Sequence, residues 1–311
     1  MTIMAEATVR HEPVLLREAL AALAVEPGGR YVDCTVDGGG HAEAILEAAA
    51  PGGALVGIDA DPETLALAAA RLSRFGAAFV AVQGNFRDLD TICRERDFAP
   101  VNGILFDLGL SSRQLDAEDR GFSFRREGRL DMRFAGKGDP TAERIVNEWA
   151  EEELANLIYG YGEEPRSRRI ARAIVAARPI DDAKQLADVV ARSAGYPRGR
   201  THPATRTFQA LRIAVNHEIE ALKAGLRQAT HVLDEGGRLV TISYHSLEDR
   251  EIKRFVNGSD DIVPLSKKVI RPSREEVQRN PRSRSAKLRV AERRSTRAGA
   301  VGSPLSPSNG A

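Results

Sequence analysis

Residues 33 to 41 read Asp33-Cys34-Thr35-Val36-Asp37-Gly38-Gly39-Gly40-His41, an acidic and glycine-rich stretch that follows a short apolar run. The apolar run at 31–35 is typical of a buried strand, and a helical pattern begins at His41. A turn between a strand and a helix lies in the crevice outside the carboxyl ends of a parallel sheet, where ligands bind. Glycine lets the backbone approach a ligand closely, although such a turn can also be only a tight connection. The stretch is therefore a candidate ligand site.

Three further apolar runs follow, at residues 54–59, 78–82 and 103–107. They are short and do not alternate strictly, which indicates strands buried on both faces. Helical patterns lie between the first three runs, at 41–50 and 61–72, and the second begins with Asp61 as N-cap and Pro62 at the first helical position. The alternation of strand and helix predicts a parallel, doubly wound sheet.

The next convincing strand, 238–243, comes after a predicted helix at 214–232 and a turn at 234–237, and a final strand is predicted at 286–292. The interval after residue 109 is far too long for a loop. It contains helical patterns at 141–149, 151–158, 168–177 and 182–192. We therefore predict an α/β fold, a Rossmann-like sheet over residues 1–110 and 214–296 with an inserted all-helical domain at 111–213. The tail at 297–311, rich in Gly, Ser and Pro, is expected to be disordered.

The composition, 42% apolar and 29% charged, is that of an ordinary globular protein. The only two cysteines, Cys34 and Cys93, cannot build a disulfide framework, no apolar run is long enough to span a bilayer, and residues 1–12 lack the apolar core of a signal peptide. We expect a cytoplasmic protein with no membrane partner. No Cys or His cluster has metal spacing, so no metal is expected. The oligomeric state stays open, a homodimer included.

Charge is distributed unevenly although the net charge is only +1. Residues 267–297 contain three acids and twelve basic residues: Lys267, Lys268, Arg271, Arg274, Arg279, Arg282, Arg284, Lys287, Arg289, Arg293, Arg294 and Arg297. Such a segment is either a phosphate-binding edge or a solvated tail.

The predicted helical domain contains two further basic runs. The first is Arg166, Arg168, Arg169 and Arg172, and the second is Arg198, Arg200, His202, Arg206 and Arg212. We predict that both anchor nucleic acid phosphates. Stacking faces could come from one or two of its aromatic residues, most of which should be core: Phe122, Phe124, Trp149, Tyr159, Tyr161 and Phe208.

The acids of the turn restrict the ligand. A dinucleotide fingerprint needs a third glycine where Glu43 stands, and a phosphate-binding P-loop needs a Gly-Lys-Ser/Thr that is absent. Asp33 and Asp37 would repel phosphates. They suit S-adenosylmethionine, a cofactor with a cationic sulfonium and an amino group.

Two later residues extend the predicted site. Asp59 ends the second strand about 20 residues beyond the glycines, where an acid accepts bonds from ribose hydroxyls; the alternative is that it caps the following helix. Phe86 follows the third strand, in the usual place for a residue that lines an adenine, although a lone Phe is more often core.

Several motifs together are similar to a known family. They are His11 to Leu16, Asp33 to His41, Asp59 to Pro62, Asp107 to Asp116, Arg120 to Phe124, Leu130 to Arg133, His202 to Arg212, Ser243 to Arg250 and Asn280 to Ser285. The chain resembles the bacterial ribosomal RNA small subunit methyltransferase H family, also called MraW, over nearly its whole length. It departs from the family at Asp37, where glycine is usual; Asp tolerates a positive φ better than most residues, so the turn can survive.

The resemblance implies methyl transfer from S-adenosylmethionine to the exocyclic N4 of a cytidine in the decoding centre of 16S small-subunit rRNA. It also implies that the Rossmann-like sheet is a class I methyltransferase domain that carries a helical insertion. By motif position, the implied cofactor contacts are Gly39, Gly40, His41, Asp59, Phe86, Asp107 and Gln114.

Two residues are candidates for the chemistry. The N4 lone pair is delocalised into the cytosine ring, so an enzyme helps by accepting a bond from the amine and holding it near the methyl group. We predict that Asp107, at the end of the fourth strand, does this, unless it only binds the cofactor. His245, after the fifth strand, could assist deprotonation or serve a structural role within Ser243 to Glu248.

Two other functions remain compatible with the sequence. One is methylation of another nucleic acid, such as DNA. The other is a non-catalytic ribosome-assembly factor that uses the cofactor as a structural ligand, against which the intact Gly39, Gly40, Asp59 and Asp107 argue.

Overall fold

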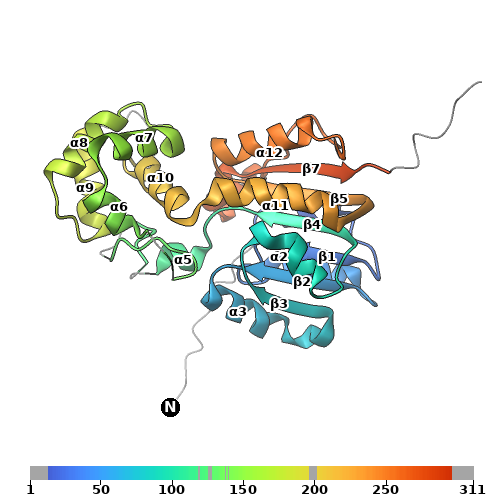
Figure 1. The fold of residues 1–311 in the computed structure, drawn as a ribbon. Helices are drawn as coiled ribbons and strands as arrows, with labels where there is room; N and C mark the ends of the chain where they lie inside the picture. Colours follow the sequence, from blue (N-terminus) through green and yellow to red (C-terminus); the bar gives the residue numbers. More distant parts are fainter. Residues whose placement is uncertain are drawn as a thin grey trace, which may run out of the picture.

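The computed structural model describes residues 13–117, 120–124, 128–136, 138, 140–195 and 202–295. Its centre is a seven-stranded sheet in the order β3-β2-β1-β4-β5-β7-β6 (Figure 1). The strands are β1 (Arg30–Asp33), β2 (Ala54–Asp59), β3 (Phe79–Gln83), β4 (Val101–Asp107), β5 (Leu233–Ser243), β6 (Ile262–Pro264) and β7 (Lys287–Arg293). Strands β1 to β5 are parallel, whereas β7 pairs antiparallel with β5 and β6. The predicted Rossmann-like fold is confirmed.

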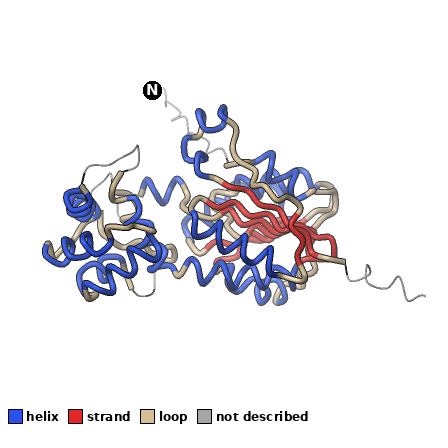
Figure 2. The backbone as a smooth tube through the Cα atoms, turned by 90° about the horizontal axis from the view of Figure 1, so that it is seen from above, coloured by secondary structure: helices blue, strands red, loops and turns tan. Residues whose placement is uncertain are grey.

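Helices cover both faces of the sheet (Figure 2). On one face α1 (Leu16–Leu23), α2 (Gly40–Ala49) and α3 (Pro62–Leu72) pack in a cluster that includes Leu55 and Leu105. On the other face α4 (Leu89–Arg94), α11 (Glu218–Val232) and α12 (Ser246–Gly258) pack in a cluster that includes Val56 and Ile104. Neighbouring strand residues thus point to opposite faces, and both faces are buried, which is why these strands read as continuous apolar runs.

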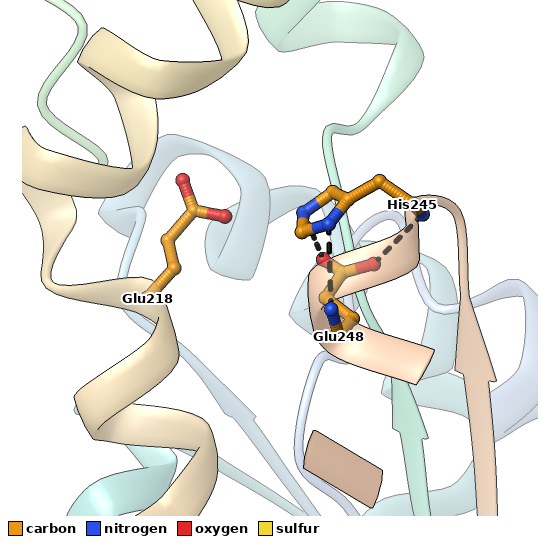
Figure 3. A group of neighbouring side chains, drawn as sticks. All are labelled: Glu218, His245 and Glu248. Atoms are coloured by element: carbon orange, nitrogen blue, oxygen red, sulfur yellow. Dashed lines mark hydrogen bonds and ion pairs between the residues drawn. The ribbon is translucent and has the colours of Figure 1, made fainter. Parts of the chain in front are cut away.

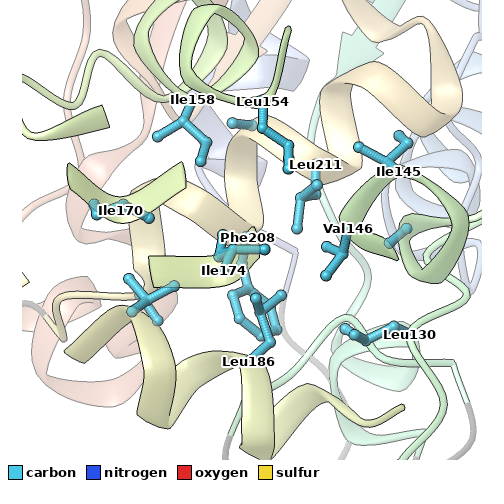
Figure 4. Close-up of a cluster of buried hydrophobic side chains, with 14 of the residues drawn as sticks. Leu130, Ile145, Val146, Leu154, Ile158, Ile170, Ile174, Leu186, Phe208 and Leu211 are labelled. Atoms are coloured by element: carbon cyan, nitrogen blue, oxygen red, sulfur yellow. The ribbon is translucent and has the colours of Figure 1, made fainter. Parts of the chain in front are cut away.

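In the second part of the chain, the described residues form helices and loops and no strand apart from an isolated bridge between Arg129 and Asp182 (Figure 1). It contains α5 (Ser112–Asp116), α6 (Ala142–Glu148), α7 (Glu151–Gly162), α8 (Ser167–Ala176), α9 (Ala183–Ala194) and α10 (Thr205–Asn216). These helices bury their own hydrophobic cluster, with Leu130, Ile145, Leu154, Ile170 and Phe208 at its centre (Figure 4). We infer that this part is the inserted domain, because its core is separate from the two clusters against the sheet.

One predicted helix is wrong. Residues 214–232 were expected to form a single helix, but α10 ends at Asn216 and α11 begins at Glu218. Between them His217 takes a left-handed conformation, with φ +50°, and its N–H closes α10 by donating to the carbonyl of Ile213. We infer that the return from the helical part to the sheet lies at His217, three residues later than expected.

The predicted turn at 234–237 exists as an irregularity within β5. Val101 pairs with Leu233, but Gly103 pairs with Arg238, so extra residues bulge out of the register. Gly236 has φ +77°, a conformation that glycine adopts without steric cost.

Some expectations concern residues outside the described part of the chain. The tail at 297–311, the motif residues His11 and Glu12, and the anchors Arg198 and Arg200 belong to this group. Among the described residues, no helix is long and apolar enough to cross a membrane.

The contact between α7 and α10 leads to a test of the packing in the helical part. An added Cβ at Gly162 would lie 2.6 Å from the backbone oxygen of Arg206, whereas an added Cβ at Gly160 would meet nothing within 4 Å. We expect Gly162→Ala to destabilise the protein by about 1–3 kcal/mol, because two backbones must separate. Gly160→Ala should stabilise it by up to about 1 kcal/mol, as alanine does in an exposed helix. Urea unfolding measures both, and equal shifts of the two midpoints would contradict this packing.

Candidate active site

A cavity of about 450 Å³ lies where the carboxyl ends of the strands meet the helical part, a volume typical of small-molecule sites. Residues from the sheet side and from the helical side both line it. From the sheet side come Thr35, Asp37, Asp59, Phe86, Asp107, Tyr244 and His245, and from the helical side come Gln114, Phe122, Phe124, Phe208 and Arg212. The cavity therefore has one wall from each part of the chain.

Five of the predicted site residues line this cavity: Asp59, Phe86, Asp107, Gln114 and His245. Gly39, Gly40 and His41 do not. A Cβ at Gly40 would lie 2.4 Å from Pro13, and Gly39 has φ +78° with Leu72 close by. These glycines thus have a packing reason of their own, and their role in binding the cofactor stays a prediction.

Asp107, the last residue of β4, is held in a fixed orientation. Its Oδ1 accepts a bond from the Tyr244 hydroxyl at 2.8 Å, and its backbone N–H donates to Thr35 Oγ1 at 2.7 Å. His41 lies behind it, with Nδ1 at 3.5 Å from Asp107 Oδ2 and Nε2 at 3.0 Å from the carbonyl of Val14. Burial raises the pKa of Asp107 to about 7, although the bond from Tyr244 acts in the opposite direction. Burial also lowers the pKa of His41, so its ring is neutral at pH 7.

Asp59, the last residue of β2, is held by backbone groups. Its Oδ2 accepts from the N–H of Asp37 at 3.0 Å and its Oδ1 from that of Asp61 at 2.8 Å. The N-cap of α3 is Asp61, whose side chain accepts from Glu63 N–H, so the alternative role of Asp59 as the cap is wrong. Burial raises the pKa of Asp59 to about 7, and the same cause acts on Asp33, which lies beneath the turn with 1% exposure.

Asp37 adopts φ +45°, a positive value that aspartate tolerates better than most residues. Its N–H donates to Asp59, and the residue lines the cavity. Asp37 thus adopts the left-handed conformation that the turn requires and adds another acid to the cavity.

Gln114 lines the cavity but is already bonded. Its Nε2 donates to Asp61 Oδ2 at 3.0 Å, and its Oε1 accepts from Ser111 N–H at the start of α5. Arg120 also donates to Asp61, at 2.9 Å. Burial acts to raise the pKa of Asp61, but the bonds from Gln114 and Arg120 outweigh it and hold the pKa below its usual value. This charged group ties the helical part to the first turn of α3.

His245 caps α12 and is bound to its own helix (Figure 3). Its Nδ1 accepts from Glu248 N–H at 3.4 Å, and its Nε2 lies 3.1 Å from Glu248 Oε1. Glu248 Oε2 in turn accepts from the backbone N–H groups of Tyr244 and His245. These contacts favour the structural alternative for His245, although its ring still lines the cavity.

Glu218 of α11 faces this pair across the cavity wall, and donor atoms of the three side chains lie within 4.8 Å of one another (Figure 3). Both Glu218 oxygens already accept bonds from Arg212, at 2.7 and 2.8 Å. A cation would have to compete with this guanidinium, so we assign the group to hydrogen bonding.

The predicted RNA anchors differ in their exposure to solvent. Arg168, Arg169 and Arg172 are exposed on α8, while Ile170 and Ile174 of the same helix are fully buried, as expected. Arg212 is different: its side chain is 12% exposed and bound to Glu218, so its prediction as a surface phosphate anchor is wrong. Of the C-terminal basic segment, Arg282 reaches the cavity from the 3-10 helix η3 (Pro281–Ser285).

The carboxylates of the cavity determine which ligand fits. Among the described residues, no lysine or arginine pairs with Asp59 or Asp107. Phe86 adds an aromatic wall and packs edge-on against Phe106, with ring centroids 5.4 Å apart. The carboxylates of Asp59 and Asp107 and the aromatic wall fit S-adenosylmethionine, which carries two positive groups and an adenine.

The tertiary contacts that hold these residues were missed by sequence reasoning. Tyr244 binds Asp107, which is 137 positions away in the sequence. Glu248 binds the backbone of Tyr244 from 4 positions away, and Glu218 binds Arg212 from 6 positions away. A tyrosine after the fifth strand was the one available signal for Tyr244, since parallel strands end at the same edge.

Comparison with known proteins gives consistent results. The sequence matches the MraW methylase family over residues 8–294. A protein of Dehalococcoides mccartyi is 53% identical over 91% of this chain and 86% of its own length, and one of Thermomicrobium roseum is 53% identical over 91% and 93%. One of Trichormus variabilis is 46% identical over 93% of each chain. All three are called ribosomal RNA small subunit methyltransferase H.

Solved structures are less similar. A putative rRNA methylase from Clostridium thermocellum has a TM-score of 0.47 at 13% identity and covers 91% of this chain and 98% of its own. A putative methyltransferase of Streptococcus mutans in complex with SAH has a TM-score of 0.45 at 11% identity and covers 91% and 99%.

The raised pKa values predict a pH-dependent affinity for S-adenosylmethionine. Asp59 and Asp107 are partly protonated near pH 7, and a cation binds their ionised forms better. Affinity should therefore rise from about pH 6 to about pH 8, and binding near pH 7 should release protons. Calorimetric titration in two buffers of different ionisation enthalpy measures the released protons. Asp107→Asn should release fewer, and proton uptake by the wild type would contradict the assignment.

Proposed function

Since the chain belongs to the MraW methylase family, we propose that it methylates the N4 amino group of a cytidine in the decoding centre of 16S small-subunit rRNA. Its cofactor is S-adenosylmethionine. The observation that carries the proposal is the fixed Asp107 carboxylate on the cavity wall, where it can accept a bond from an amine. The name shared by the relatives supports the small-subunit rRNA as substrate.

Asp107 has the central role in this mechanism. S-adenosylmethionine, when bound, supplies a methyl group made electrophilic by a positive sulfur. Asp107 Oδ2 accepts a hydrogen bond from the N4 amine, which orients the nitrogen for an in-line displacement. After the methyl carbon has bonded to N4 and its bond to sulfur has broken, the nitrogen loses a proton, and the carboxylate can take it. A pKa of about 7 suits Asp107 to accepting and releasing that proton near neutral pH.

Neighbouring residues hold Asp107 in place. Tyr244 donates to Oδ1, which leaves Oδ2 for the amine, and neutral His41 lies 3.5 Å from Oδ2. His245 remains our second candidate for the chemistry, but its bonds to α12 favour a positioning role over proton transfer.

The route of the RNA follows from the depth of the site. Asp107 lies in a cavity between the sheet side and the helical side, so the target base must leave its stack to enter this cavity. Exposed Arg168, Arg169 and Arg172, together with Arg282 at the cavity, supply cationic groups for the RNA backbone. Binding by such contacts weakens as salt increases.

Transfer of labelled methyl groups tests the proposed function. We expect assembled small subunits to accept label from wild-type protein and digestion of the rRNA to yield N4-methylcytidine, whereas naked rRNA and DNA should accept less. Asp107→Ala should abolish transfer, while Asp188→Ala, an exposed aspartate of α9, should retain it. Full activity of Asp107→Ala, or label in DNA alone, would refute the proposal.

Tyr244→Phe gives a second prediction that concerns pH. The Tyr244 hydroxyl lowers the pKa of Asp107, so its loss should raise that pKa further above its present value of about 7. The rate of methyl transfer depends on ionised Asp107 and rises with pH. We therefore expect the midpoint of the pH profile to move to higher pH in Tyr244→Phe, with the folded state preserved. An unchanged midpoint would mean that Asp107 ionisation does not control the rate.

A further inference from the structure

Arg212 of α10 is an unusual residue for the wall of a cavity. Its side chain is only 12% exposed, and Glu218 binds it side-on, Nε to Oε1 at 2.7 Å and Nη2 to Oε2 at 2.8 Å. Two parallel bonds fix both the position and the plane of a guanidinium. Arg212 is therefore held rigidly at the edge of the cavity that it lines.

The remaining nitrogen, Nη1, carries two N–H donors. Among the described residues it has no hydrogen-bond partner, since the bonds of Arg212 run from Nε and Nη2 to Glu218. Arg212 lines the cavity with a side chain that is 12% exposed, so a ligand with acceptor atoms can bond to these two donors. The other charged residues that line the cavity are acids, His245 and Arg282.

A short chain of contacts connects Arg212 with Asp107. Burial acts to raise the pKa of Glu248, but His245 and, after it, the positive charge of Arg212 act in the opposite direction and hold the pKa below its usual value. Glu248 accepts from the backbone N–H of Tyr244, whose hydroxyl donates to Asp107. The cavity thus has a fixed acceptor, Asp107, and a fixed donor, Arg212, that share one supporting network.

This pair matches one edge of cytosine. The base offers a donor at N4 and acceptors at N3 and O2, whereas uracil offers an acceptor at position 4 and a donor at N3. We propose that Arg212 Nη1 donates to the N3 and O2 edge of the target base while its N4 faces Asp107, and that Glu218 is the positioning residue that aims the guanidinium. The inference rests on the proposed function, which supplies the cytidine.

A double-mutant cycle between enzyme and substrate tests this contact. The protein variants are Arg212→Gln and, as matched control, Arg144→Gln, which removes an exposed arginine of α6 paired with Glu148. The substrates are small subunits that carry cytidine, 3-deazacytidine or 2-thiocytidine at the target position; the second lacks the N3 acceptor and the third has a weaker acceptor at position 2. Single-turnover methylation gives the rates, and calorimetry gives the affinity for S-adenosylmethionine.

With cytidine, Arg212→Gln should lose roughly 10- to 100-fold in rate, as expected for a bond to a charged group, while its affinity for the cofactor stays unchanged. Replacing cytidine by 3-deazacytidine or 2-thiocytidine should lower the methylation rate of the wild type by a larger factor than the rate of Arg212→Gln. Any intrinsic change in the reactivity of the analogue appears with both proteins and cancels. Arg144→Gln should behave as wild type.

Additive losses with both analogues would overturn the inference, even if wild type methylates N4 of cytidine. If wild type yields no N4-methylcytidine, the proposed function itself fails. Should Arg212→Gln not fold, Glu218→Gln replaces it. That variant retains Arg212 but no longer fixes its orientation. The methylation rate on cytidine should fall, and so should the factor by which each analogue lowers the rate. An unchanged factor would again refute the contact.

Discussion

Burial of aspartates at one edge of the sheet is the constraint on which the site depends. Asp33, Asp59 and Asp107 end β1, β2 and β4, and because these strands are parallel and adjacent, their carboxylates gather at one edge. Burial raises the pKa of each to about 7, because the ionised carboxylate loses its hydration in the folded protein. Backbone N–H groups and the Tyr244 hydroxyl bind Asp59 and Asp107, and no arginine or lysine among the described residues neutralises those two. The edge is thus prepared for a cationic ligand.

The helical part contributes two hydrogen-bonded charged groups to this edge. Arg120 and Gln114 bind Asp61 at the start of α3, and Arg212 binds Glu218 at the break between α10 and α11. The first group fastens the cofactor side of the cavity, and the second stands on the side where we place the base. His217, in its left-handed conformation, separates α10, which carries Arg212, from α11, which carries Glu218. Asp59 and Asp107 on the sheet wall have no lysine or arginine partner within the part of the chain that the structure describes, so we place the cofactor on the sheet side and the RNA on the helical side.

The fold could be predicted from the sequence wherever a local pattern decides it. Apolar runs buried on both faces identified the strands, and Asp61-Pro62 identified the start of α3. The break at His217 could not be predicted, since helical periodicity continues across it and only tertiary packing selects the left-handed conformation. The acids of the site were recognisable because parallel strands bring their ends together, whereas the burial of Arg212 was not, since an arginine in a basic run reads as a surface residue until its partner Glu218 is placed in space.

Carbon-13 NMR titration of the aspartate carboxyls tests the account most directly, with Asp107→Asn to assign the signal of Asp107. We expect Asp107 to titrate near pH 7 in the free protein and at a clearly lower pH once S-adenosylmethionine is bound, because the sulfonium stabilises the ionised form. A carboxyl that titrates near its ordinary value of 3.8 in the free protein, or that does not respond to the cofactor, would contradict it.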